Sequence, residues 1–378
     1  MVSAQRVLDV VECIEDDPRI QVVFTVAPDV FNQGVADYLS KLGALLLPWE
    51  QAVNHRFDLA LAAAYGGLHQ IHAPLVVLAH GAGHGKPVHP PANGGALARE
   101  LPVYGLDAQR LSRDGRGIAA VVALCHEDEL TILRCQCPEA VPAALVIGDP
   151  CYDRLVASLP LRDRYRQALR VGDHQQLVVV SSTWGRAGLF GRVPALLTSV
   201  MDQLPAERFR VAALLHPAVW GAHGVRQVRA WLRGCRQAGL ILPEPTDDWR
   251  ALVVAADHVV GDHGSVTAYA AALGRPVLLG PAPTPVPTPG SPQHVVISTA
   301  GRLVVDLPLA TQLAQAPVID HAAVTAALTS RPGSSTGVLR SRMYELMGLP
   351  EPDRHLGTAA VPVPVPAPGP APQRRAAA

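Results

Sequence analysis

The sequence predicts an α/β protein with two domains, each built on a parallel β-sheet. Two observations predict this class. The chain has 378 residues, which at roughly 150 residues per domain corresponds to two or three units. Short apolar runs rich in β-branched residues alternate with segments of helical periodicity, as in βαβ units. Because this alternation occurs in both halves, we expect two Rossmann-like domains facing a cleft, with ligands at the carboxyl ends of the strands.

The composition excludes several classes of protein. Hydrophobic residues make up 49% of the chain and charged residues 17%, so there is ample apolar surface for a core. Lys+Arg and Asp+Glu both number 32, and this zero formal charge argues against a nucleic-acid partner. The six cysteines form neither a disulfide scaffold nor a zinc set. No apolar run reaches the ~20 residues of a membrane span. We therefore expect a cytoplasmic protein whose membrane contact, where it has any, is peripheral and at the inner face.

The first domain is expected over residues 1–155. Its helical periodicity begins at residues 7–14. A doubly wound domain usually opens with a strand, and two explanations for the helical start stay open: the first strand is missing, or the domain begins with a helix. Apolar runs predict strands over residues 20–26, 45–47, 59–63, 75–79, 118–123 and 144–147, with a helix over 30–42.

The second domain is expected over residues 156–350. Proline-dense residues 281–292 predict a stiff loop beside the strand ends of this domain. Residues 351–378 are rich in Pro and Ala, which predicts a disordered tail. The same patterns predict helices over 162–170, 193–204, 225–238, 249–256 and 265–273, and strands over 177–180, 209–215, 258–261 and 276–279.

Two polar motifs follow strands of the first domain. Residues 80–86 read HGAGHGK, in which small residues let backbone N–H groups approach an anion and Lys86 adds positive charge. The motif is not a Walker A loop, because Pro87 follows Lys86 where that loop needs Ser or Thr. A flexible turn with solvent-facing histidines is the alternative. Residues 148–153 read GDPCYD, and their composition favours a simple turn.

Two strand ends of the second domain carry candidate phosphate ligands. Thr183 follows a buried strand, where its hydroxyl can contact phosphate or sugar; a capped turn is the alternative. His216 ends another strand and can donate to a phosphate oxygen, although a core or surface histidine is the more common case.

The clearest motif is GDHGSVT at residues 261–267. A buried strand ends in a polar turn containing Asp262, His263 and Gly264, and a helix opens at Ser265. The first N–H groups of a helix have no intrahelical partners, and the helix dipole favours negative charge there. A diphosphate could bind at this point. The alternative is that Asp262 or Ser265 merely caps the helix.

Taken in order, these motifs resemble the CDP-glycerol glycerophosphotransferase family, the teichoic-acid polymerase type with a GT-B fold. The resemblance covers residues 74–279 and rests on short motifs and their order. The chain departs from the family where Cys151 and Gly185 replace arginines, where His263-Gly264 replaces Tyr-Ser, and where Lys86 lies one residue farther from His80. The motif counterparts are His80-Gly81 with Lys86, residues 148–153, residues 182–185, His216-Pro217, and residues 262–265 with Arg275-Pro276.

The resemblance implies a transferase that moves a glycerophosphate or glycosyl group from a CDP- or UDP-type donor to a hydroxyl acceptor in cell-envelope polymer synthesis. It implies His80 as general base and places the donor diphosphate at the helix near Ser265, with no cofactor and no required metal. The lost arginines favour an alternative, a catalytically lapsed nucleotide-binding or scaffolding protein of the same fold; a nucleotide-sugar epimerase ranks third. The residues expected to bind donor or phosphate are Lys86, Thr183, His216, Asp262, His263, Gly264, Ser265 and Arg275.

Overall fold

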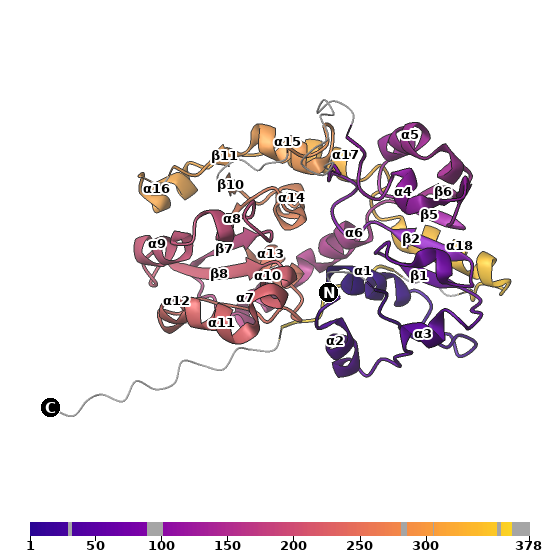
Figure 1. The fold of residues 1–378 in the computed structure, drawn as a ribbon. Helices are drawn as coiled ribbons and strands as arrows, with labels where there is room; N and C mark the ends of the chain where they lie inside the picture. Colours follow the sequence, from indigo (N-terminus) through magenta and orange to yellow (C-terminus); the bar gives the residue numbers. More distant parts are fainter. Residues whose placement is uncertain (29–31, 89–100, 281–285, 305, 354–356, 365–378) are drawn as a thin grey trace. The chain divides into compact units, whose positions relative to one another are not determined.

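A computed structural model describes residues 1–28, 32–88, 101–280, 286–304, 306–353 and 357–364 (Figure 1). These residues separate into two compact units. The first comprises Met1–Arg154, Pro285–Ser298 and Asp320–Ala359, and the second comprises Leu155–Thr284, Thr299–Ile319 and the residues from Ala360, as far as they are described. The sequence predicted one crossing between domains near residue 155. The structure differs, because the chain returns to the first unit twice after residue 284.

The first unit is built on a parallel sheet with the strand order β1-β2-β5-β6. The strands β2 and β5 are wholly buried runs of Val, Leu and Ala, as expected for a parallel sheet covered on both faces. The strands are β1 (Ala60–Ala62), β2 (Leu75–Leu78), β5 (Val121–Leu124) and β6 (Ala144–Val146), with a hairpin of β3 (Ser112–Arg113) and β4 (Arg116–Gly117). The helices that lie or begin in this unit are α1 (Val2–Val11), α2 (Val35–Lys41), α3 (Trp49–Ala52), η1 (Leu68–Gln70), α4 (Ala108–Leu111), α5 (Glu127–Gln136), η2 (Pro138–Ala143), α6 (Pro150–Ser158), α15 (Pro292–Thr299), α17 (His321–Leu328) and α18 (Ser335–Met347).

The regular strands predicted over residues 20–26 and 45–47 are wrong. These segments meet only at an isolated parallel bridge between Phe24 and Leu46. Phe24 N–H donates to the Leu45 carbonyl at 2.8 Å, and Leu47 N–H donates to the Phe24 carbonyl at 2.8 Å. Residues 20–27 line an apolar cavity that also reaches β1, so the segment has no regular ladder to join.

The second unit is built on a parallel sheet with the order β11-β10-β9-β7-β8. The connection order reverses between β7 and β9, and such a switch point is where doubly wound sheets bind ligands. The strands are β7 (Gln176–Ser182), β8 (Phe209–Leu215), β9 (His258–Gly261), β10 (Val277–Leu279) and β11 (Gly301–Arg302). The helices are η3 (Leu159–Leu161), α7 (Arg162–Ala168), α8 (Leu189–Arg192), α9 (Leu196–Gln203), α10 (Pro217–His223), α11 (Val225–Trp231), α12 (Arg233–Gln237), α13 (Arg250–Ala255), α14 (Ser265–Ala272) and α16 (Leu309–Ala314).

Two described residues of the predicted Pro/Ala-rich tail, Glu351 and Val361, make defined contacts in the structure. Glu351 accepts a hydrogen bond from Arg340 Nε at 3.0 Å. Farther on, Val361 is fully buried; its N–H donates to Ser158 Oγ at 2.9 Å, and its carbonyl accepts from the Tyr165 hydroxyl at 2.5 Å. Residues 365–378 lie outside the described residues, so the expected disorder there stays a prediction.

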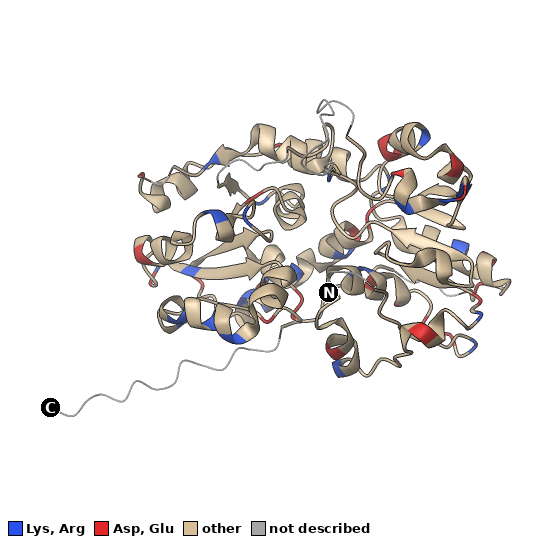
Figure 2. Cartoon of the chain, viewed as in Figure 1, with Lys and Arg blue, Asp and Glu red and all other residues tan. Residues whose placement is uncertain are grey.

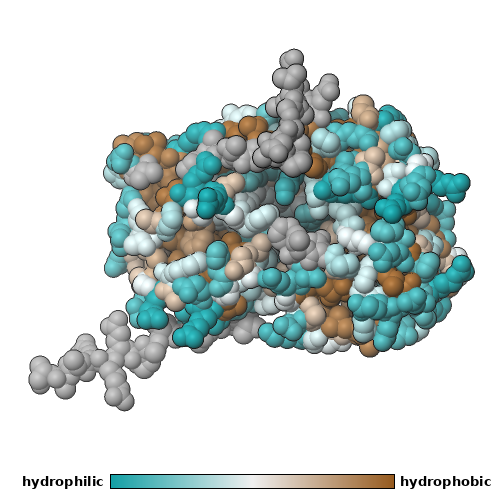
Figure 3. Space-filling model, in the orientation of Figure 1, coloured by the Kyte–Doolittle hydropathy of each residue, from teal (hydrophilic) through white to brown (hydrophobic). Residues whose placement is uncertain are grey.

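Arginines are concentrated on the surface of α11 and α12 (Figure 2). Arg226, Arg229, Arg233 and Arg236 are all exposed, and Arg229 forms an ion pair with Glu244. The surface over these helices is hydrophilic (Figure 3), which is typical of a solvated face. Among the described residues, no helix has both the length and the apolar character needed to span a bilayer.

Candidate functional site

In the first unit, charged and aromatic side chains gather where β2 ends. The His80 ring lies edge-on to the Tyr104 ring, with centroids 5.8 Å apart. Lys86 Nζ is 5.6 Å from the centre of the Tyr104 ring, and the Arg110 guanidinium is 4.1 Å from it. We refer to His80, Lys86, Tyr104 and Arg110 as the Tyr104 cluster. It combines an imidazole with two cations beside one ring.

The cations of the Tyr104 cluster suit an anionic ligand. Partial burial lowers the pKa of Lys86, and the charge of Arg110 lowers it further. Two positive groups that repel one another are stabilised when an anion binds between or beside them. Sequence reasoning selected His80 and Lys86 but missed Tyr104 and Arg110, which belong to no motif and are brought there by the fold.

The glycine-rich loop at residues 80–86 is braced by the protein itself. Arg6 donates to the Gly81 carbonyl at 3.1 Å, Gln293 Nε2 to the Ala82 carbonyl at 3.0 Å, and Thr288 N–H to the Gly85 carbonyl at 3.0 Å. Gly85 packs closely against Gln293 and Ser291, and a Cβ there would require these side chains to shift. These contacts fix the loop in place, so it is not the flexible turn that the sequence left open as an alternative.

These contacts also correct the placement of the proline-dense loop. Its described residues, 286–291, lie in the first unit beside Gly85, whereas the sequence predicted a position beside the strand ends of the second domain. Residues 281–285 of that predicted loop lie outside the described residues.

Two buried carboxylates anchor the same edge of the first sheet. Asp149 is fully buried and accepts from Arg6 at 3.2 Å and from the N–H groups of Cys151 and Tyr152 at 2.8 and 2.9 Å. Asp149 thus caps α6, which is the simple turn that the local sequence favours. The Cys151 side chain is buried, at a position where the resembling family has arginine.

Glu129 is the second of these carboxylates, and it holds the loop through His84. Its Oε1 accepts from His84 N–H at 2.7 Å and lies 3.2 Å from His84 Nδ1, and its Oε2 accepts from Cys125 N–H at 2.7 Å. Burial acts to raise the pKa of Glu129, but the His84 ring and these donors outweigh it and lower the pKa below its usual value.

In the second unit, polar residues meet at the carboxyl ends of three adjacent strands. Register places Ser182 of β7 opposite Leu215 of β8, and Val180 of β7 opposite Val260 of β9. The residues that follow, Thr183, His216 and Asp262, therefore share one edge at the β7/β9 switch point. Six of the predicted residues lie in this switch-point cluster: Thr183, His216, Asp262, His263, Gly264 and Ser265.

Asp262 ties the loops of this cluster together. It is 4% exposed, and its Oδ2 accepts from Thr183 N–H and Leu189 N–H, both at 2.8 Å, and from Thr183 Oγ1 at 2.9 Å. Its Oδ1 accepts from Gly264 N–H at 3.0 Å. Because its carboxylate bonds to protein donors, we interpret Asp262 as a positioning residue and not as a ligand for donor.

Helix α14 begins beside Thr183. Gly264 occupies the N-cap position, and a Cβ there would lie 2.6 Å from Thr183 Cγ2, so the two loops touch because this residue is glycine. The N-cap glycine has no side chain with which to cap α14. The half-buried His263 lies within the same turn. The helix start, with the Ser265 hydroxyl at its first position, is suited to an anion.

His216 has a defined orientation at the start of α10. Its Nδ1 accepts from Ala218 N–H at 3.1 Å. An Nδ1 that accepts leaves the proton of a neutral imidazole on Nε2. A neutral His216 therefore carries its ring proton on Nε2, and the residue lies at the same sheet edge as Thr183.

Arg275 lies at the opposite edge of the sheet, which corrects its predicted place beside Ser265. Register pairs Val277 with Val259, so Arg275 stands level with Asp257, four residues before Gly261 and about 13 Å away along the strand. Burial lowers the pKa of Arg275, and the charge of Arg162 lowers it further. Both Arg162 and Asp257 belong to the amino edge of the strands.

Metal ligands do not cluster in the part of the chain that the structure describes: no group of three or more His, Cys, Asp or Glu is placed to hold an ion.

The two parallel-sheet units define a fold of the GT-B type, and comparison with known proteins agrees. No protein-family model matches the sequence, and no curated protein matches it. Solved structures do match. The wall teichoic acid polymerase TagF has a TM-score of 0.55 at 12% identity, over 91% of this chain and 93% of that one. A TagF variant soaked with CDPG also has a TM-score of 0.55, at 13% identity over the same shares. S. aureus MnaA, solved with UDP, has a TM-score of 0.53 at 12% identity, over 96% of this chain and 97% of that one.

Proposed function

We propose that this protein is a transferase that uses a nucleotide-diphosphate donor, and that it moves a glycerophosphate or glycosyl group to a hydroxyl acceptor in cell-envelope polymer synthesis. The observation that carries the proposal is the switch-point cluster, in which Thr183, His216 and the start of α14 share one sheet edge. The fold likeness to TagF, solved with CDPG, and to MnaA, solved with UDP, supports a nucleotide-linked donor.

The donor diphosphate would bind at the start of α14. The N–H groups of the first helical turn and the positive end of the helix dipole attract its negative charge. The Ser265 hydroxyl and His216 Nε2–H would add two donors from adjacent strand ends. These same groups stabilise the charge that develops on the nucleotide as it leaves.

The acceptor would react at the Tyr104 cluster. His80, as a neutral imidazole, takes the proton of the acceptor hydroxyl. The hydroxyl oxygen then forms a bond to the donor phosphorus, or to an anomeric carbon if the donor is a nucleotide sugar, and the bond to the nucleotide phosphate breaks. Lys86 and Arg110 would hold an acceptor that carries phosphate.

The donor most consistent with the motif order is CDP-glycerol, and one observation favours a second candidate function. The family pattern has arginines where this chain has the buried Cys151 and the exposed Gly185. A protein without those two cations could bind nucleotide without turnover. The second candidate is therefore a nucleotide-binding or scaffolding protein.

Calorimetric titration with CDP-glycerol, a UDP-sugar and CMP tests donor binding. We expect Ser265→Ala and His216→Ala each to weaken affinity about tenfold or more, as for loss of a hydrogen bond to a charged group. His223→Ala is the matched control, because His223 is exposed at the far end of α10. Unchanged affinity in both test variants would show that the donor does not bind at the switch-point cluster.

A product assay with the same donors tests turnover. We expect His80→Ala to abolish transfer and to leave donor affinity within twofold, whereas His69→Ala, an exposed histidine of the same unit, leaves both unchanged. Wild-type turnover in His80→Ala would exclude His80 as base. Donor binding with no product from the unmodified protein, across a panel of hydroxyl acceptors, would favour the scaffolding function.

A further inference from the structure

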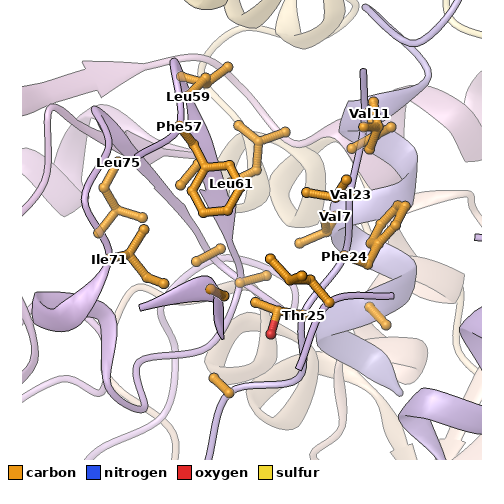
Figure 4. Close-up of a pocket in the computed structure, with 18 of the residues that line it drawn as sticks. Val7, Val11, Val23, Phe24, Thr25, Phe57, Leu59, Leu61, Ile71 and Leu75 are labelled. Carbon is orange, nitrogen blue, oxygen red and sulfur yellow. The ribbon is translucent and has the colours of Figure 1, made fainter. Parts of the chain in front are cut away.

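An apolar cavity of about 510 Å³ lies in the first unit, away from the Tyr104 cluster. Its walls are helix α1, the extended residues 20–27 and strand β1. In Figure 4, Phe57, Leu59 and Leu61 lie on one side, and Val23, Phe24 and Thr25 on the other. Apolar walls of this extent lose packing contacts when nothing fills the space between them.

Both long walls of this cavity present strand edges. Within β1, Ala60 N–H donates to the Pro74 carbonyl, next to β2. Because successive backbone groups of a strand point to opposite edges, the N–H and C=O of Leu61 point away from β2. On the other wall, both backbone groups of Phe24 bond to residues 45–47, so those of Val23 and Thr25 point the other way. Among the described residues, β1 pairs with no strand other than β2.

A buried hydroxyl in the cavity also lacks a partner. Thr25 Oγ1 is buried and has no hydrogen-bond partner in the described part of the chain. Thr25 points into the cavity among apolar side chains (Figure 4). Such an oxygen is satisfied by a ligand that carries polar groups as well as apolar ones, as a peptide backbone does.

The connections around the cavity are those of a βαβ unit that lacks its first strand. Arg6, in the second turn of α1, contacts Gly81 and Asp149, which follow β2 and β6. Helix α1 therefore starts at the carboxyl edge of the sheet, and residues 20–26 run back across it. A strand leading into α1 by a short turn would run parallel to β1, as right-handed crossovers require. Met1 and Ala4 line the cavity, so that strand would end beside it.

We propose that the cavity is a strand slot: it holds an extended, apolar β-strand, parallel to β1 and joined directly to the amino end of α1. The strand would pair with Leu61 on one side and with Val23 and Thr25 on the other. The sheet order would then become residues 45–47, residues 20–26, the new strand, β1, β2, β5 and β6, which reverses at the slot as in a doubly wound sheet. Its sequence would be a continuous apolar run, because both faces of a central parallel strand are buried.

Two extended proteins test this assignment. One carries, before Met1, six Val, Ile and Leu residues followed by Gly-Asn as a turn; the matched control carries eight Gly and Ser residues. We expect the apolar extension to slow amide exchange at Leu61, Val23 and Thr25 by at least tenfold relative to the control. We also expect it to raise the thermal midpoint by about 5 °C or more. Equal exchange and equal midpoints in the two proteins would overturn the proposal.

A second measurement separates the strand from other occupants. The dye 8-anilinonaphthalene-1-sulfonate binds apolar cavities through its aromatic rings. We expect it to bind the Gly/Ser-extended protein and to be excluded by the apolar extension. Dye binding that is unchanged by the extension would make the cavity a small-molecule pocket and would refute the slot. Protection of Leu61 by the six-residue peptide added in trans, but not by the fused extension, would assign the slot to a separate chain and would also refute the proposal.

Discussion

Replacing Asp262 should destabilise the second unit more than its single side chain suggests. The carboxylate is 4% exposed and accepts four hydrogen bonds, from Thr183 N–H, Thr183 Oγ1, Leu189 N–H and Gly264 N–H. In Asp262→Ala the Thr183 hydroxyl can rotate to water, but three backbone donors lose their acceptor. A buried donor left unsatisfied costs about 1–3 kcal/mol.

The size of the effect follows from the exposure of these three donors. Leu189 is buried, whereas Thr183 and Gly264 are half-buried and can regain water. The buried Leu189 N–H contributes a full penalty, and the two half-buried donors contribute partial ones. Removing the buried charge offsets part of this cost. We therefore expect Asp262→Ala to lower the free energy of unfolding by about 3 kcal/mol, or roughly a hundredfold in the folding equilibrium. Asp262→Asn keeps an oxygen at the Oδ2 position but turns an N–H toward Gly264, so we expect about 1–2 kcal/mol.

Urea unfolding followed by tryptophan fluorescence measures this, because four of the five tryptophans, at positions 184, 220, 231 and 249, belong to the second unit. With a slope of about 2 kcal/mol/M, Asp262→Ala should lower the midpoint by about 1.5 M. Asp202→Ala is the control, since Asp202 is exposed on α9 and should change stability by less than about 0.5 kcal/mol. A midpoint for Asp262→Ala equal to that of Asp202→Ala would show that the four bonds do not hold these loops.

Two more predictions concern the amino edge of the same sheet. Asp257 accepts from Arg162, Arg166 and Leu177 N–H, and although burial acts to raise its pKa, these donors lower it below the ordinary 3.8. Its stabilisation is therefore full above about pH 4 and is lost as the pH falls through the lowered value. Urea midpoints of the wild type and Asp257→Asn should differ at pH 7 and converge as the solution becomes more acidic; a constant difference would contradict the assignment. Arg275→Ala should leave donor affinity within twofold in calorimetry, because Arg275 lies at the sheet edge away from Ser265. A tenfold loss of affinity would show that Arg275 belongs to the donor site.

The sequence predicts strands well where burial on both faces leaves no ambiguity. Residues 209–215 and 258–261 were predicted as strands and form β8 and β9 with those bounds. Residues 20–26 are equally apolar, yet they form only a bridge. A segment forms a regular strand only when neighbouring segments pair with it. The sequence of residues 20–26 does not show whether such neighbours are present.

The candidate site was predictable to the extent that it follows from strand ends. Thr183, His216 and Ser265 each follow a predicted strand, and parallel strands end at one edge, so their grouping could be expected. Arg275 is ten residues from Ser265 in sequence, but α14 carries the chain back to the other edge in between, and only the register shows this. Tyr104 and Arg110 carry no motif at all, and their position beside His80 depends on how residues 101–111 fold.

The two interpretations of the GDHGSVT turn, a phosphate site and a helix cap, make different demands on Asp262. A capping Asp262 would accept from the N–H groups of the first turn of α14 and offset the positive end of the helix dipole, worth about half an elementary charge. Its carboxylate bonds to Thr183, Leu189 and the N-cap residue Gly264, so most of its hydrogen bonds go to the loops beside the helix. The acid thus ties together the loops around the helix start. This role of Asp262 fits our proposal that the start of α14 binds an anion, with His216 at the same sheet edge as a second donor.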